Sequence, residues 1–74
     1  MSVDVELFGQ LLPGELRRRT IHIIGPTVVR ELAIMIGLDL SEIGLITIDG
    51  VQSSLEDTVK PNSRLCFFPY VTGG

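Results

Sequence analysis

Few residues of this 74-residue chain have side chains that could take part in covalent chemistry, and these few are scattered. An enzyme needs an acid, a base or a nucleophile converging in one pocket, but the chain has one histidine, His22, and one cysteine, Cys66. His22 falls on the polar side of an alternating segment, which is typical of a solvent-facing strand position. Cys66 lies between Leu65 and Phe67 with no basic residue closer than Arg64, so it is expected to be a packing residue rather than a reactive thiolate. The side chains therefore predict no catalytic site within this chain.

The composition excludes several other kinds of site. One cysteine and one histidine cannot supply the ligands of a structural zinc site or an internal disulfide, so no metal site is predicted. A formal net charge of −3 has the wrong sign for a domain held on nucleic-acid phosphates. Arg17, Arg18 and Arg19 are adjacent, but on a strand they alternate between two faces, which favours a solvated strand start over a basic patch.

No segment of the chain has the pattern of a membrane or export signal. No apolar run approaches the roughly eighteen residues of a membrane span, and the first residues lack the basic start and apolar stretch of a signal peptide. A single unpaired cysteine is also typical of a reducing compartment. We therefore expect a cytoplasmic protein whose partners are proteins, with neither nucleic acid nor membrane among them.

The residues with the most specific chemistry are the last four, Val71-Thr72-Gly73-Gly74. Two glycines have no Cβ, so they can pass through a slot that is too narrow for other residues. Four residues span at most about 14 Å, which is enough to carry the carboxylate of Gly74 into the active site of another protein. We predict a flexible tail over residues 71–74 with Gly74 as its reactive group, and a frayed end without a role is the alternative.

The residues before this tail must fold into a domain that positions it. Alternating apolar residues predict strands at 3–8 and 18–24, which form a hairpin. A β-branched run at 45–48, the turn Asp49-Gly50 and a short return strand at 51–52 predict a second hairpin. The last predicted strand is 64–69, with Leu65 and Phe67 on one face and Cys66 and Phe68 on the other. Residues 38–44 are expected to form a loop in which Leu38 and Ile43 are buried.

One helix is predicted between the two hairpins, from Val28 to about Ile36. Thr27 is placed to cap its start, and Gly37 is placed to end it. Ile34 is expected to be exposed. The apolar stripe comprises Val28, Val29, Leu32, Met35 and Ile36. Laying this stripe on one face of a mixed sheet is the most economical way to bury it, so we expect an α+β domain of two layers with the first and last strands as central neighbours.

The order of these elements, together with the ending Phe67-Phe68-Pro69-Tyr70-Val71-Thr72-Gly73-Gly74, resembles the MoaD and ThiS family of ubiquitin-like sulfur carriers. The likeness covers the whole chain and is most specific at the end, which is similar to the family's Phe-Pro-Pro-Val-Ala/Ser-Gly-Gly. Tyr70 replaces the second proline, and Thr72 replaces the small residue. The resemblance implies a single β-grasp domain over residues 1–74, in which a mixed sheet packs on one main helix.

The resemblance also implies a function. In that family a ubiquitin-activating-type adenylyltransferase, similar to MoeB or ThiF, adenylates the terminal glycine carboxylate with ATP and magnesium, and the product becomes a thiocarboxylate that donates sulfur. Carried over, Gly74 is the modified group and Gly73 is its slender lead, while ATP and magnesium belong to the partner and this chain binds no cofactor. The chain would be a carrier rather than an enzyme, with a sulfur-accepting synthase subunit as second partner. The long connection from Phe8 to Arg18 favours the molybdopterin type over the thiamin type.

The expected partner-binding residues are Phe8, Arg64, Phe68, Pro69 and Tyr70. Phe8 and Phe68 fall on adjacent strands on the face away from the helix, where they would form an apolar patch rimmed by Arg64 and Tyr70. A protein of this size rarely exposes two neighbouring phenylalanines without a partner. The alternative function is a ubiquitin-like adaptor that binds through its sheet with no covalent chemistry at its tail.

Overall fold

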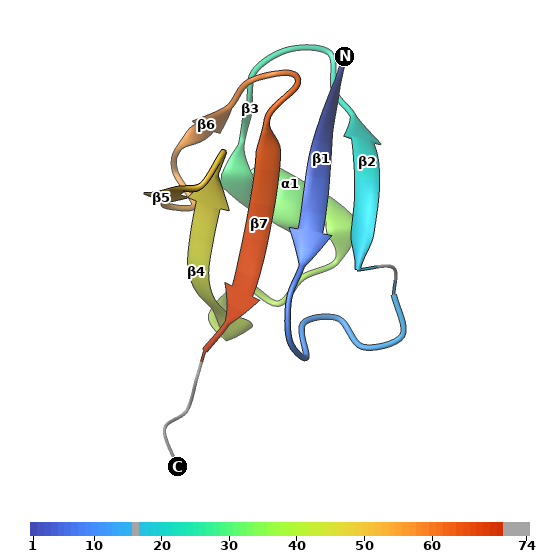
Figure 1. Cartoon of the computed structure of the whole chain (residues 1–74), viewed down its shortest axis with the longest axis vertical. Coiled ribbons are helices and arrows are strands. Elements are labelled where there is room, and N and C mark those ends of the chain that lie inside the picture. The colour runs from blue at the N-terminus through green and yellow to red at the C-terminus, as the bar shows by residue number, and fades with distance from the viewer. Residues whose placement is uncertain (16, 71–74) are drawn as a thin grey trace.

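A computed structural model of the chain, which describes residues 1–15 and 17–70, shows a five-stranded mixed sheet with one helix across one face (Figure 1). The sheet strands are β1 (Ser2–Leu7), β2 (Arg18–His22), β4 (Ile43–Ile48), β5 (Val51–Ser53) and β7 (Arg64–Pro69). The helix is α1 (Val29–Ile36), and a short 3-10 helix, η1 (Leu40–Glu42), precedes β4. Two further short strands, β3 (Thr27–Val28) and β6 (Thr58–Val59), pair with each other.

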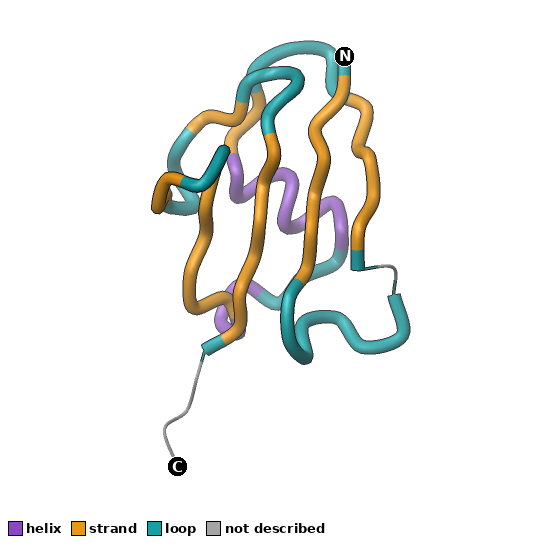
Figure 2. The backbone as a smooth tube through the Cα atoms, viewed as in Figure 1, coloured by secondary structure: helices purple, strands orange, loops and turns teal. Residues whose placement is uncertain are grey.

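The spatial order of the sheet is β2-β1-β7-β4-β5. β1 and β7 run parallel as neighbours in the middle, with β2 on the outer side of β1 and the hairpin β4–β5 on the other side, next to β7 (Figure 2). Parallel pairing of the first and last strands requires the chain to cross over between them, and α1 lies in that crossover. The prediction of central first and last strands is confirmed, and the arrangement is a β-grasp fold.

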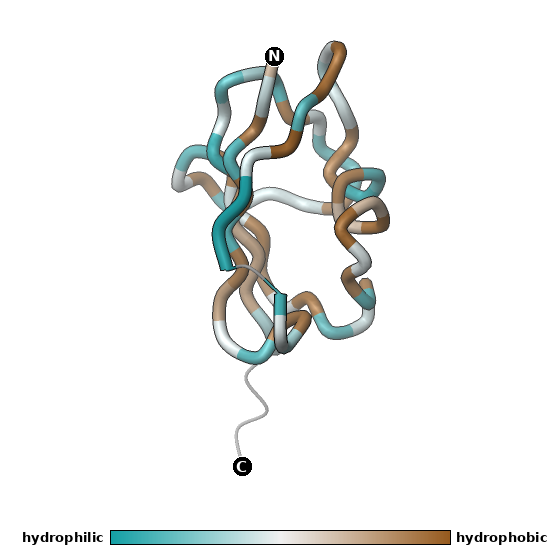
Figure 3. The backbone as a smooth tube through the Cα atoms, turned by 90° about the vertical axis from the view of Figure 1, so that its right-hand side faces the viewer, coloured by the Kyte–Doolittle hydropathy of each residue, from teal (hydrophilic) through white to brown (hydrophobic). Residues whose placement is uncertain are grey.

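The core lies between the sheet and α1, which form two layers when seen from the side (Figure 3). Alternate residues of the central strands point inward, as their period of two requires. Val3, Val5 and Leu7 of β1 and Leu65 and Phe67 of β7 are at most 2% exposed. The other faces of these strands carry Asp4, Glu6, Cys66 and Phe68. The inner face is therefore committed to the core, and the outer face is available for function.

The start of α1 differs from the prediction. Thr27 does not cap the helix: its hydroxyl donates to the carbonyl of Gly25 at 2.9 Å, and α1 begins at Val29 without a side-chain cap. Thr27 and Val28 instead form β3, whose partner β6 was not predicted. The first two helical amides donate to the carbonyls of Asp57 and Leu55, both at 2.9 Å, so a distant loop satisfies the donors that a capping side chain would otherwise take.

The buried side of α1 also differs from the predicted stripe. Met35 was expected in the core but is 63% exposed, whereas Ala33 was not expected there and is completely buried. At about 100° per residue, the buried residues Val29, Leu32, Ala33 and Ile36 span an arc centred about 50° from Leu32, on the side of Ala33. Met35 lies outside this arc, whereas the small side chain of Ala33 packs inside it. Ile34 is exposed, and Gly37 ends the helix with φ of 99°, both as predicted.

Candidate partner-binding face and chain exit

Phe8 and Phe68 lie together on the outer face of the sheet. The amide of Phe8 donates to the carbonyl of Phe67 at 3.0 Å, which continues the β1–β7 register by one residue and sets Phe8 beside Phe68. The two rings stack with centroids 4.4 Å apart and planes 11° from parallel. Leu45 of β4 is the register partner of Phe68 on its other side and is 37% exposed. We call Phe8, Leu45 and Phe68 the apolar end of the face.

Leu45 was missed by the sequence analysis. The alternation of β4 shows that Leu45 and Ile46 point to opposite faces, but not which of them faces solvent beside Phe68. Only the antiparallel register with β7, in which Ile46 opposes the buried Phe67, settles that point. This register depends on the irregularity between Ile43 and Leu45, and no local sequence pattern marks that irregularity.

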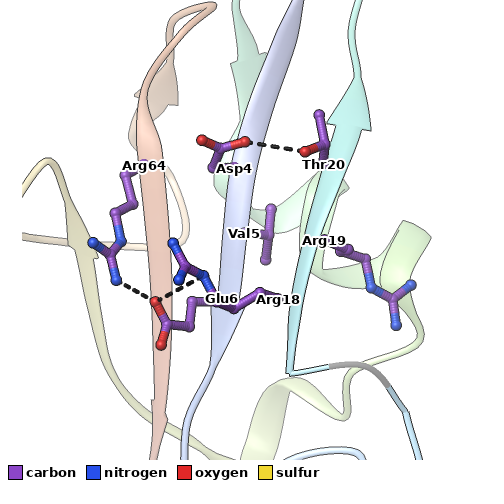
Figure 4. A pocket seen from close by; sticks show the side chains of 7 residues that line it. All are labelled: Asp4, Val5, Glu6, Arg18, Arg19, Thr20 and Arg64. Carbon is purple, nitrogen blue, oxygen red and sulfur yellow. Dashed lines mark hydrogen bonds and ion pairs between the residues drawn. The ribbon is translucent and has the colours of Figure 1, made fainter.

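The opposite end of the same face is charged. Asp4, Glu6, Arg18, Thr20 and Arg64, here called the charged end, line a hollow of about 190 Å³ together with Val5 and Arg19. Glu6 of β1 accepts a hydrogen bond from the guanidinium of Arg64 on one side and lies 3.7 Å from Nε of Arg18 on the other (Figure 4). Arg19 points away from Glu6. The Glu6 carboxylate raises the pKa of the Arg64 guanidinium, first by this hydrogen bond and then by its charge.

This geometry places Arg64 at the charged end of the face. Arg64 begins β7, and a register row formed by Glu6 and Cys66 lies between it and the stacked phenylalanines. Its side chain donates to Glu6, so Arg64 borders the charged hollow. The sequence could not show this, because Glu6 and Arg64 are 58 positions apart and meet only through the parallel pairing of β1 with β7.

The three consecutive arginines do not form a basic patch. The guanidinium of Arg17 donates to the carbonyls of Gly9 at 3.1 Å and Leu12 at 2.6 Å, and it thereby ties down the connection between β1 and β2. Arg18 lies against Glu6, and Arg19 lies 3.6 Å from the carboxylate of Glu15. Each arginine is thus engaged within the domain, which agrees with the interpretation of this segment as a strand start.

The remaining side chains that could react or bind a metal lie apart from each other. Cys66 is 8% exposed and lies between its register partners Glu6 and Thr47, while His22 is exposed on the edge strand β2. Among the described residues no group of three or more histidine, cysteine, aspartate or glutamate side chains could hold a metal ion. In the same part of the chain, none of the helices is long and apolar enough to cross a membrane.

Pro69 and Tyr70, which we call the chain exit, lie directly beyond the apolar end. Pro69 is the register partner of Ile43, and the amide of Tyr70 donates to the carbonyl of Glu42 at 3.2 Å. Tyr70 is 64% exposed, and a hollow of about 240 Å³ separates this segment from the residues near Leu11. The predicted reactive tail, Val71, Thr72, Gly73 and Gly74, lies outside the described residues.

Comparisons with known proteins bear on the fold. No family model and no curated protein matches the chain. Among solved structures it is similar to one described as the protein-protein complex of subunits 1 and 2 of the molybdopterin-converting factor from Helicobacter pylori 26695, with a TM-score of 0.64 and 23% identity. The match covers 100% of both chains. The molecule therefore has the β-grasp fold of a molybdopterin-converting factor subunit.

Proposed function

We propose that this chain is a sulfur carrier in which the carboxylate of Gly74 is adenylated by a partner enzyme and then converted to a thiocarboxylate. The observation that carries the proposal is the likeness over 100% of both chains to a molybdopterin-converting factor subunit, in a sequence that closes with Gly73-Gly74. That likeness favours a sulfur acceptor in molybdopterin synthesis, and a thiamin-type acceptor is the second choice.

The chemistry asks little of this chain's own side chains. The Gly74 carboxylate attacks the α-phosphorus of ATP, pyrophosphate leaves, and the resulting acyl adenylate has a good leaving group. Inorganic sulfide or a bound sulfide equivalent then forms a C–S bond to the carbonyl carbon, and AMP departs. In this proposal the partner holds ATP and magnesium.

The outer face provides the means of docking in this proposal. The apolar end has two stacked aromatic rings and Leu45 next to the chain exit, so a partner that covers it also receives the start of the tail. Both the adenylyltransferase and a sulfur-accepting synthase subunit would use this face, one after the other. Buried aromatic side chains at the centre of an interface commonly supply most of its binding energy.

A ubiquitin-like adaptor is the competing function, because an apolar end suffices for binding without any reaction at the tail. The two functions differ in their requirement for the exact C-terminus. The carrier needs a free carboxylate on Gly74, since adding or removing one residue moves that group by about 3.5 Å from the attacking geometry. The adaptor works equally well with either change.

The test is an intact-mass measurement after incubation with ATP, magnesium, inorganic sulfide and a MoeB- or ThiF-like adenylyltransferase from the same source. The enzyme is first shown to be active by ATP–pyrophosphate exchange with a different carrier protein that it is known to adenylate. The carrier should gain the mass difference between one sulfur and one oxygen atom, and fragmentation should place the change on Gly74. Deletion of Gly74, or addition of an alanine after it, should abolish the shift.

The matched control is Thr72→Ala, which keeps the tail length and introduces a small side chain. It should gain sulfur as the original chain does. An unchanged mass of the original chain in the presence of the active enzyme would overturn the carrier function. Sulfur gain by the alanine-extended chain without trimming would overturn the assignment to Gly74, and full function of both tail variants would support the adaptor.

A further inference from the structure

The chain exit packs against a glycine of β4. Gly44 lies at the register shift between Ile43 and Leu45, and a Cβ there would be 2.8 Å from the carbonyl oxygen of Pro69. The same Cβ would be 2.9 Å from both the nitrogen and the Cα of Tyr70. Gly44 is not in the left-handed region, so this close approach to backbone atoms, rather than its own conformation, is what requires glycine.

A second glycine approaches the chain exit from the other side. Gly9 follows β1 with φ of 61°, and a Cβ there would be 2.7 Å from Cγ and 3.2 Å from Cδ of the Pro69 ring. β1 and β4 flank β7 on opposite sides, so the two glycines enclose Pro69 between them. Arg17 fixes Gly9 by donating to its carbonyl at 3.1 Å, and Glu42 fixes Tyr70 by accepting its amide at 3.2 Å.

We propose that Gly9 and Gly44 form a collar that fixes where and in which direction the chain leaves the sheet, and that the reaction of the tail depends on this direction. They are positioning residues, since neither touches the reacting carboxylate. The second half of the statement rests on the proposed carrier function, whereas the first half is a property of the isolated domain.

The collar matters because the tail after it is short. Residues 71–74 reach at most about 14 Å, so a partner that holds both the apolar end and the carboxylate leaves them little slack. A displacement of about 1 Å at the chain exit is then passed on to the carboxylate. Misplacement of a reacting group by that distance can reduce a rate by about 100-fold.

The first experiment needs no partner and uses Gly44→Ala with Gly25→Ala as its matched control. Gly25 is also outside the left-handed region, but a Cβ there meets nothing within 4 Å. Relief of the clash requires a shift of β4 at residue 44 or of the Pro69–Tyr70 backbone, and either shift weakens the hydrogen bond from Tyr70 to Glu42. Amide hydrogen exchange at Tyr70 should therefore become about tenfold faster in Gly44→Ala and stay unchanged in Gly25→Ala. Equal exchange in the two variants would overturn the collar.

A second pair keeps the proposal testable if Gly44→Ala does not fold. Gly9→Ala should likewise expose the Tyr70 amide, and its control is Gly14→Ala, which has a left-handed φ of 88° and open space around it. The Gly9 contact is with the Pro69 ring, so Pro69→Ala should restore protection to Gly9→Ala, measured against Pro69→Ala alone. Pro69→Ala should not restore protection of the Tyr70 amide in Gly44→Ala, because the Gly44 contact is with backbone atoms. Equal behaviour of the two double variants would contradict this assignment.

The dependence of the reaction is tested by single-turnover sulfur incorporation at increasing adenylyltransferase concentration. Gly44→Ala should lower the rate at saturating enzyme by about tenfold or more, because saturation compensates for any loss of binding at the chain exit but not for a misplaced carboxylate. An unchanged saturating rate would overturn the positioning role. If the original chain gains no sulfur, the proposed function and the positioning role both fail, and exchange at Tyr70 still decides whether the collar exists.

Discussion

The two ends of the outer sheet face share the strands β1 and β7 but differ in how far their side chains satisfy one another. At the charged end, Glu6 binds Arg64 and lies near Arg18, and the hydroxyl of Thr20 donates to Asp4 at 3.1 Å. At the apolar end, Phe8 and Phe68 stack on each other and remain only half-buried, and Leu45 beside them is 37% exposed. A step of two residues along both strands separates the ends, since Glu6 pairs with Cys66 and Phe8 lies beside Phe68.

This difference indicates which end gains from a partner. Charges that are already paired must be desolvated before an interface can cover them, and the gain is small. Apolar surface gains free energy simply by leaving water, at about 25 cal/mol per Å². The apolar end is therefore expected to supply affinity, and the charged end to set orientation and to exclude wrong partners.

The largest expected effect on partner binding is that of Phe68→Ala. It should weaken binding to the adenylyltransferase by about 2 kcal/mol, or about 30-fold in Kd, because it removes the ring at the centre of the apolar end. Thr20→Ala, on the charged end, is the control and should change Kd by less than about threefold. Calorimetric titration measures both, and circular dichroism checks the fold. Equal losses in the two variants, or unfolding of Phe68→Ala, would show that the two ends have been assigned wrongly.

A smaller effect is expected for Glu6→Gln, which removes the negative charge between Arg18 and Arg64. The stability of the domain in urea should fall at low salt and approach that of the original chain at about 1 M salt, where charges are screened. Glu56→Gln is the control, because Glu56 pairs with Arg30 of α1, and no other ion pair of Glu56 is seen within residues 1–15 and 17–70. Its loss should be smaller. A loss at Glu6 that is the same at both salt concentrations would indicate a packing role instead.

The smallest effect concerns acid stability near the chain exit. Asp39 accepts hydrogen bonds from the side chain and then the backbone of Ser41, which lower its pKa from the ordinary value of 3.8. A lowered pKa stabilises the fold above the ordinary value, and this contribution is lost as the pH falls through the lowered one. In urea titrations from pH 6 to about pH 2, the original chain should therefore lose more stability than Asp39→Asn. Parallel curves of stability against pH for the two proteins would contradict this role of Asp39.

Local patterns in the sequence predicted the parts of the fold that depend on neighbours along the chain. The last strand, Arg64–Pro69, begins and ends where its alternation placed it, and Gly37 ends the helix in the left-handed region. The opposite orientations of Phe67 and Phe68 follow from the strand period alone. The pairing of β1 with β7 was also expected, because a single helix in so short a chain leaves few other ways to bury its stripe.

Errors arose wherever two distant segments share a structural task. Thr27 was assigned as the helix cap because nine residues without Gly or Pro follow it, yet its segment pairs with β6, about thirty positions away. Met35 was placed in the core because the predicted stripe was centred on Leu32, whereas burial depends on which side of α1 meets the sheet. The carboxylate partner of Arg64 was missed for the same reason, since only strand pairing brings Glu6 beside it.

The sequence by itself therefore determined the faces of the strands and the end of the helix, because these depend on a period of two or 3.6 residues and on glycine's freedom at positive φ. The tertiary structure alone decided the roles of Leu45, Gly9 and Gly44. A bulge sets the register of Leu45 against Phe68, and β1 and β4 bring the two glycines against Pro69 and Tyr70. Contacts of this kind form only when the whole sheet has assembled, so no local residue spacing could predict them.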